Sequence, residues 1–186
     1  YQTERNSGAG QAGNSTRMLI LCGDTTPTGG VIHANIGHVT IASTGTGTDS
    51  GNDMTQARRL LAQFSNSTRA CAAGGYEPTS DIIDFTTISS MSAGVDFGNL
   101  AASVYFLDGS SSSTRGVILK SSATNTIQFV TISTTGDAID FGDAQTTGQN
   151  LGVANNSTRI VFAEGGSPSI VNTISFLTTA TTGNAI

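Results

Sequence analysis

Short runs of alternating apolar and polar residues recur along the chain, separated by Gly, Ser, Thr and Asn. In the segment NTIQFVTIST, Ile127 and Phe129 fall on one side of an extended chain, and Val130 and Ile132 fall on the other. Alternation of this kind predicts β-strands rather than helices. A strand that is apolar on both sides must be covered on both sides, so we expect sheets that stack face to face.

The strand pattern occurs four times. Each copy contains Ser-Thr-Arg, and successive arginines are 52, 46 and 44 residues apart. A short apolar run follows each arginine, and an equivalent isoleucine comes next: Ile36, Ile83, Ile127 and Ile174. An Asp-x-Gly-(Asn/Asp) element follows at Asp49–Asn52, Asp96–Asn99 and Asp140–Asp143. Self-similarity at a fixed period is the signature of a repeat architecture.

Four candidate strands in about 46 residues match the size of one β-propeller blade. We therefore predict an all-β, four-bladed β-propeller that forms a single domain, residues 1–186. The predicted repeats are 17–68, 69–114, 115–158, and 159–186 completed by 1–16. In this prediction the N-terminal strand, near Gln2–Gly10, pairs with the sheet of Ile174 and Phe176 and removes its free edge. A segment of a longer β-repeat array and a β-solenoid are the alternatives.

The arginine that occurs once per repeat is expected to be structural. Arg17, Arg69, Arg115 and Arg159 would hold neighbouring repeats together by reaching either an aspartate or a carbonyl at a strand end. Asp96 and Asp140 are the expected aspartate partners, because a planar guanidinium suits a carboxylate. The equivalent aromatic residues Phe85, Phe129 and Phe176 are expected to be buried between sheets.

Other polar and sulfur-containing residues have plain structural explanations. Asn-Ser-Thr begins at Asn14, Asn66 and Asn156, where asparagine side chains favour turns. Cys22 and Cys71 are expected to be buried thiols. His33 and His38 face opposite sides of a strand and do not form a metal pair. The oxygen-rich segment 44–53 is expected to be an exposed loop, and calcium binding there is the alternative considered.

The repeat "STRG-x-I … NTI-x-F-x-TISTTG-x-AIDFGD" resembles the kelch-like tandem repeats of marine bacteriophage tail and virion proteins, cyanophages especially. The resemblance covers essentially the whole chain. The first copy departs most, with His38 in place of the Phe and Ser50 in place of the Phe of Asp-Phe-Gly. The resemblance implies a non-enzymatic structural or adhesive module of a virion or tail fibre, part of an extracellular particle.

The partners implied are other virion proteins, copies of the chain itself, or a host surface glycan. A secreted bacterial lectin-like propeller is the alternative.

Composition excludes several other classes of function. The net charge is −5, with 8 basic and 13 acidic residues, and no basic cluster is present for nucleic acid. No apolar run approaches the roughly 20 residues that span a membrane. No Gly-x-Ser-x-Gly motif is present, so no enzyme, catalytic residue, metal or cofactor is predicted.

Overall fold

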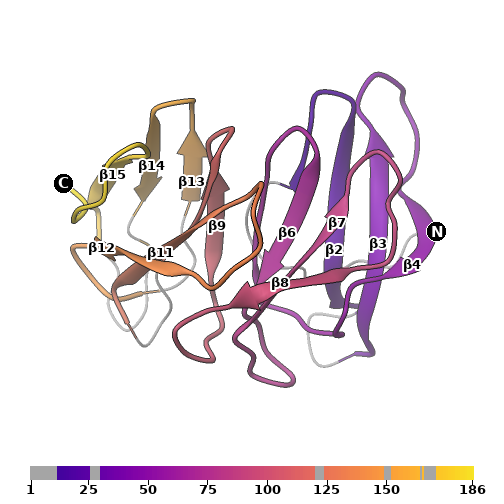
Figure 1. Cartoon of the computed structure of the whole chain (residues 1–186), viewed down its shortest axis with the longest axis horizontal. Coiled ribbons are helices and arrows are strands. Elements are labelled where there is room, and N and C mark those ends of the chain that lie inside the picture. Colours follow the sequence, from indigo (N-terminus) through magenta and orange to yellow (C-terminus); the bar gives the residue numbers. More distant parts are fainter. Residues whose placement is uncertain (1–11, 26–29, 120–123, 149–151, 164, 166–170) are drawn as a thin grey trace.

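The computed structural model describes residues 12–25, 30–119, 124–148, 152–163, 165 and 171–186. These residues form fifteen β-strands and no helix (Figure 1). The strands make four antiparallel sheets in which neighbours along the chain are also neighbours in space. The all-β prediction is therefore confirmed.

Each sheet is a simple antiparallel meander. The first sheet contains β1 (Ala12–Gly13), β2 (Arg17–Asp24), β3 (Ile32–Thr40) and β4 (Thr48–Asp53). The second contains β5 (Ala62–Ser65), β6 (Arg69–Ala73), β7 (Ile82–Thr87) and β8 (Val95–Asn99). The third contains β9 (Asp108–Ser111), β10 (Arg115–Leu119), β11 (Thr126–Thr131) and β12 (Ile139–Asp143). The fourth contains β13 (Gly152–Asn155), β14 (Arg159–Ala163) and β15 (Ile174–Thr178).

The sheets are offset from the repeats as numbered from the sequence. The strand before each Ser-Thr-Arg pairs with the strand after it, so that Ser65 lies opposite Ala70 in the β5–β6 pair. A sheet therefore begins before the arginine and not at it. For the same reason β1 pairs with β2 in the first sheet and does not complete the fourth. The segment Gln2–Gly10, which was expected to close a ring, lies outside the described residues.

The four sheets stand in a row, and the sheets containing β4 and β15 lie at opposite ends of the molecule (Figure 1). The first strands of neighbouring sheets, β1, β5, β9 and β13, lie next to one another. Within the described residues the row is open, and a closed four-bladed ring is not observed.

The turn between the first two strands explains why Asn precedes Ser-Thr-Arg. In the second sheet Asn66 Oδ1 accepts hydrogen bonds from Thr68 N, Thr68 Oγ1 and Arg69 N at 2.9, 3.0 and 2.8 Å. Asn14 and Asn156 make the same three contacts in their sheets. A side-chain oxygen thus replaces a backbone acceptor in the turn, as predicted.

The hydrophobic core is divided among the three boundaries between sheets. At each boundary one sheet contributes its trailing face, the face that points toward the next sheet along the chain. In the second sheet this face includes Cys71, Ala73 and Ile83. The next sheet contributes its leading face, the face that points toward the preceding sheet. In the second sheet this face includes Ala70, Ala72 and Ile88. These six residues, on opposite faces of the second sheet, are completely buried because each face packs against a neighbouring sheet. Strands that are apolar on both sides therefore receive the double cover that their pattern requires.

The glycine of Asp-Phe-Gly lets the fourth strand of a sheet touch the next repeat. Gly98 has φ of 151°, and a Cβ there would collide with the backbone of Gly136. Gly136 N donates a 2.7 Å hydrogen bond to Phe97 O, and Ala138 N donates a 2.8 Å bond to Asn99 O. Because the contact is backbone to backbone, a side chain at this position would separate β8 from the third sheet.

Candidate functional site

The repeated arginines link each sheet to the next. Their Nη1 atoms donate to backbone carbonyls that follow the third strand of the next sheet. The pairs are Arg17 with Ile88 O (3.2 Å) and Ser89 O (2.7 Å), Arg69 with Ile132 O (2.9 Å), and Arg115 with Thr179 O (2.9 Å). Of the two kinds of acceptor considered from the sequence, the structure therefore has the strand-end carbonyl.

The expected pairing with Asp96 and Asp140 is wrong for the residues described. Both aspartates are exposed, and none of the ion pairs found in the described part of the chain includes them. The reason is geometric: Asp96 lies on β8, opposite Asp84, whereas Arg69 starts β6 on the other side of β7. The guanidinium of Arg69 instead lies over the ring of Phe85.

The repeated phenylalanines serve as platforms for the arginines. The distances from the guanidinium carbon to the ring centroid are 4.3 Å for Arg69 on Phe85, 4.6 Å for Arg115 on Phe129 and 4.7 Å for Arg159 on Phe176. Phe129 is buried, whereas Phe85 and Phe176 are half-buried. Burial was expected for all three, but Phe85 and Phe176 are partly exposed. A guanidinium over an aromatic face adds cation–π attraction to the packing.

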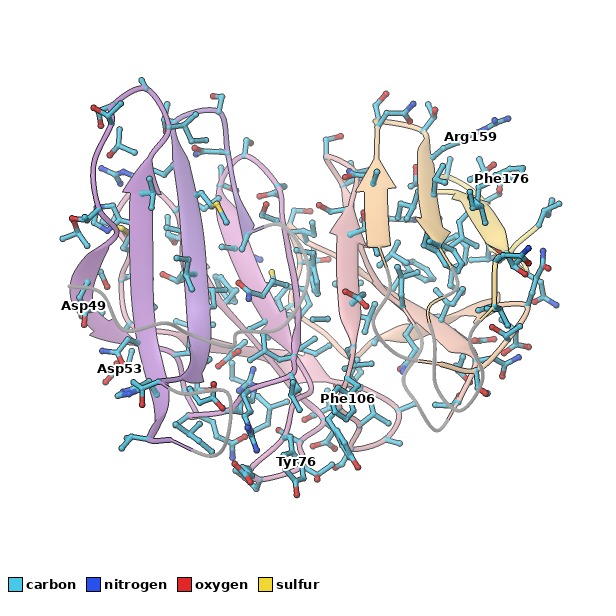
Figure 2. The ribbon with its side chains drawn as sticks, turned by 180° about the vertical axis from the view of Figure 1, so that it is seen from behind. Asp49, Asp53, Tyr76, Phe106, Arg159 and Phe176 are labelled. Carbon is cyan, nitrogen blue, oxygen red and sulfur yellow. The ribbon has the colours of Figure 1, made fainter. Side chains whose placement is uncertain are left out.

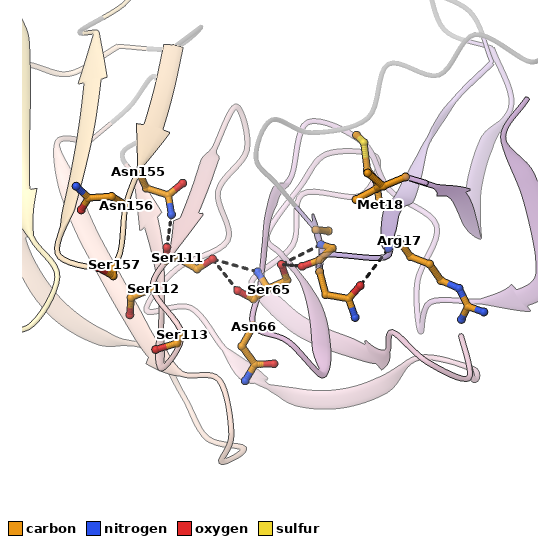
Figure 3. Close-up of a pocket in the computed structure, with 14 residues that line it drawn as sticks. Arg17, Met18, Ser65, Asn66, Ser111, Ser112, Ser113, Asn155, Asn156 and Ser157 are labelled. Atoms are coloured by element: carbon orange, nitrogen blue, oxygen red, sulfur yellow. Dashed lines mark hydrogen bonds between the residues drawn. The ribbon is translucent and has the colours of Figure 1, made fainter. Parts of the chain in front are cut away.

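A second set of links runs between the first strands of neighbouring sheets (Figure 3). Ser65 Oγ accepts a hydrogen bond from Gly13 N at 2.9 Å and donates one to Gly13 O at 2.7 Å. Ser111 Oγ bridges the backbone of Ser65 in the same way, at 3.4 and 2.7 Å. Asn155 Nδ2 donates to Ser111 O. One polar side chain per sheet thus satisfies backbone groups of the preceding sheet.

These turns and first strands enclose a groove of about 620 Å³ that crosses all four sheets (Figure 3). Its lining combines hydroxyl and amide groups with the apolar residues Ala12, Met18 and Ile41, and Arg17 is the one charged residue among the described lining residues. The polar lining side chains are Asn14, Arg17, Ser65, Asn66, Ser111, Ser112, Ser113, Asn155, Asn156 and Ser157. From the sequence the asparagines were interpreted as turn residues only, and the groove was not predicted.

Two asparagines in the groove present amide donors to solvent. Their Oδ1 atoms are used in the turns, but no hydrogen bond from Nδ2 of Asn66 or Asn156 to another described residue is present. Asn14 differs, because its Nδ2 donates to Ser67 O at 3.1 Å. With the serine hydroxyls, which both donate and accept, the groove offers hydrogen bonds at equivalent positions of successive sheets.

A buried ion pair lies at the boundary between the first and second sheets. Arg58 and Asp84 form it with an Nη2–Oδ1 distance of 2.5 Å, and both side chains are completely buried. Asp84 Oδ2 also accepts a hydrogen bond from Thr55 N at 3.0 Å, and Arg58 Nη2 donates to Ala72 O at 3.2 Å. These partners compensate for the loss of water around two charges. This pair was not predicted from the sequence.

An aromatic cluster lies at the rim opposite Arg159 (Figure 2). The ring centroids of Tyr76 and Tyr105 are 4.8 Å apart, and those of Tyr105 and Phe106 are 5.2 Å apart. Phe106 has φ of 57°, a left-handed conformation that is unusual for a bulky residue. Arg59 lies 5.6 Å from the Tyr76 centroid. This cluster joins residues that are distant in sequence, and no motif indicated it.

The remaining sequence candidates have local roles. Cys22 and Cys71 are buried thiols, as predicted, and burial raises the pKa of Cys71. Asp49 lies on β4, where its carboxylate accepts hydrogen bonds from Asn35 Nδ2 (2.8 Å) and Gly51 N (3.0 Å). His33 and His38 both lie on β3. Among the described residues no group of three or more His, Cys, Asp or Glu side chains is placed to hold a metal ion.

Comparison with known proteins leaves the family open. No protein-family model matches the chain, and no curated protein matches it. In the part of the chain that the structure describes, no helix has the length and apolar character needed to cross a membrane.

Proposed function

We propose that this protein is a non-enzymatic structural or adhesive repeat module that binds a glycan chain along the groove at its Asn-Ser-Thr-Arg turns. The observation that carries the proposal is the repetition of hydrogen-bonding side chains at equivalent positions of successive sheets. A ligand that matches such a surface has a repeat of its own and carries donors and acceptors throughout its length. A polysaccharide has both properties.

The charge of the groove also favours a glycan. Hydroxyl and amide groups pair with sugar hydroxyls and need no charge on the ligand. Arg17, at the first-sheet side of the groove, suits a carboxylate on an acidic sugar. A nucleic acid is disfavoured, because the chain carries a net charge of −5 and phosphate contacts need clustered basic residues.

The proposal that this module belongs to a virion rests on what its repeats resemble. Similarity to kelch-like repeats of phage tails and virions favours a virion protein that attaches to a host surface glycan. A secreted bacterial lectin would use the same groove. The open row of sheets supports a β-repeat array more than a four-bladed propeller closed within one chain.

A glycan array followed by calorimetric titration of the best ligand tests the proposal. Asn66→Asp and Asn156→Asp keep the Oδ1 atom that the turn needs and remove the Nδ2 donor. We expect the double variant to bind on the order of tenfold more weakly, as two hydrogen bonds of about 0.7 kcal/mol each would give. The control is Tyr105→Ala at the opposite rim, which should bind like the parent.

Two results would overturn the proposal. One is the absence of any bound glycan on the array. The other is undiminished binding by the double aspartate variant together with loss of binding in Tyr105→Ala, which would place the ligand at the aromatic cluster.

A further inference from the structure

The leading face of the first sheet is apolar and exposed. Its members are equivalent to the buried leading residues of the other sheets. Met18 is 50% exposed and Ile41 is 57% exposed, whereas their equivalents in the second sheet, Ala70 and Ile88, are completely buried. Exposed apolar surface of this kind marks an interaction site when it forms a face rather than isolated residues.

The trailing face of the fourth sheet is exposed in the same manner. Val161 is 40% exposed and Ile174 is 71% exposed, whereas the equivalent Cys71 and Ile83 of the second sheet are completely buried. Arg159 projects from the same sheet close to Phe176 (Figure 2). The row of sheets therefore presents one half of its internal boundary at one end and the other half at the opposite end.

The polar link of the internal boundary is also divided between the two ends. Arg159 stacks on Phe176 at 4.7 Å, much as Arg115 stacks on Phe129 at 4.6 Å. Arg115 donates to a carbonyl in the next sheet, whereas no such acceptor for Arg159 is present among the described residues. At the other end of the row, the first sheet has a turn at the position where the other sheets carry the acceptor. In this turn Ile41 N donates to Thr16 O at 2.9 Å.

That turn has the geometry of the turns that receive an arginine. Thr179 N donates to Thr158 O at 2.9 Å, and Ile132 N donates to Thr114 O at 2.9 Å, as Ile41 does to Thr16. Ile41 therefore occupies the same turn position as Ile132 and Thr179, whose carbonyl oxygens accept from Arg69 and Arg115.

We propose that two copies of this chain associate head to tail. The trailing face of the fourth sheet in one copy covers the leading face of the first sheet in the other, and Arg159 donates to the carbonyl of Ile41 in the second copy. The contact between copies would repeat the boundary between sheets that is formed three times inside the chain. Such a contact joins two different surfaces, so it generates a ring or a filament. Met18 and Ile41 also line the groove, so this contact and a bound glycan share surface at the first sheet, but the association is tested without glycan.

Light scattering coupled to size-exclusion chromatography tests the association over a concentration series. The parent chain should show masses that rise in multiples of 18.9 kDa as its concentration increases. Ile41→Asp and Ile174→Asp each place a charge in one of the two faces, and each variant should remain at 18.9 kDa. Both positions are exposed, so folding is preserved, and circular dichroism verifies it.

Mixing the two variants gives the sharper test. Ile41→Asp keeps an intact trailing face, and Ile174→Asp keeps an intact leading face, so the mixture should form a species of two chains and none larger. Ile139→Asp is the control, because Ile139 is 61% exposed but lies on β12, outside both end faces, and it should assemble like the parent. A parent chain that stays at 18.9 kDa at every concentration, or a mixture that stays at that mass, overturns the proposal.

Discussion

Arg69 and Ile132 join two sheets across 63 residues of sequence: the Nη1 atom of Arg69 donates a 2.9 Å hydrogen bond to the carbonyl oxygen of Ile132. The same guanidinium covers the ring of Phe85, which belongs to its own sheet. One side chain therefore packs within a sheet and bonds to the next. Because the hydrogen bond to the next sheet recurs for Arg17 and Arg115, it is a general feature of this repeat.

Arg69→Ala should lower the free energy of unfolding by about 2–3 kcal/mol, because it removes a charged hydrogen bond and a cation–π contact. Arg159→Ala is the matched control. Arg159 has the same stacking on Phe176 but is exposed and has no acceptor among the described residues, so its loss should be below about 1 kcal/mol. Urea denaturation of dilute protein measures both. Equal losses would show that the contact between sheets contributes nothing.

Phe129→Ala should lower the free energy of unfolding by about 3–5 kcal/mol, as core aromatic truncations do. Phe129 is 8% exposed and packs edge to face on Phe141 with ring centroids 5.8 Å apart. Phe176→Ala should have a smaller effect, because that residue is only partly buried. Thermal and urea unfolding of both variants checks the order, and a Phe129 variant that melts like the parent contradicts this view of the core.

Asp84→Asn should lower the free energy of unfolding by about 3–5 kcal/mol, because it leaves the charge of Arg58 buried without its partner. Adding Arg58→Met should restore much of that stability, since a methionine fills similar space without a charge. The comparison of single and double variants by urea denaturation isolates the pair. If the double variant is as unstable as the sum of the two single variants, the ion pair is not the source of the loss.

Cys71 should react with a thiol reagent only when the protein unfolds. Burial raises its pKa from the ordinary value of 9.0, so the folded protein holds the reactive thiolate at a low level. Above about pH 9 the unfolded chain loses this proton while the folded chain keeps it, so the contribution to stability falls as pH rises. Reaction with a disulfide reagent, with and without urea, measures the effect. Rapid reaction of the native Cys71 thiol, with Cys22→Ser as background, would falsify it.

The strands and turns were predictable because their causes are local. Alternation in NTIQFVTIST indicates a strand with two buried sides, and Asn66 before Ser-Thr-Arg indicates a turn that its own side chain closes. The phase of the sheets was not predictable in the same way. A repeating sequence fixes a period but not the residue at which a sheet begins, and only the pairing of β5 with β6 decides that.

Contacts between distant segments account for the other differences. Whether four sheets form a ring or a row depends on the angle between neighbours, which the repeat length does not contain. Arg58 lies in the connection between β4 and β5 and reaches Asp84, 26 residues further along the chain, across the boundary of the first two sheets. The longest arginine spacing, 52 residues, gave no signal for this pair, because most of its added length lies between Arg17 and Ile36 and not around Arg58.

The bonds made by Ser65, Ser111 and Asn155 all point toward the preceding sheet, and those made by Arg69 and Arg115 all point toward the following one. In these bonds every junction has the same polarity. Duplication or loss of one repeat between two others would preserve each of these bonds. A change in repeat number therefore preserves these bonds between sheets, and related chains are expected to differ in length by whole repeats.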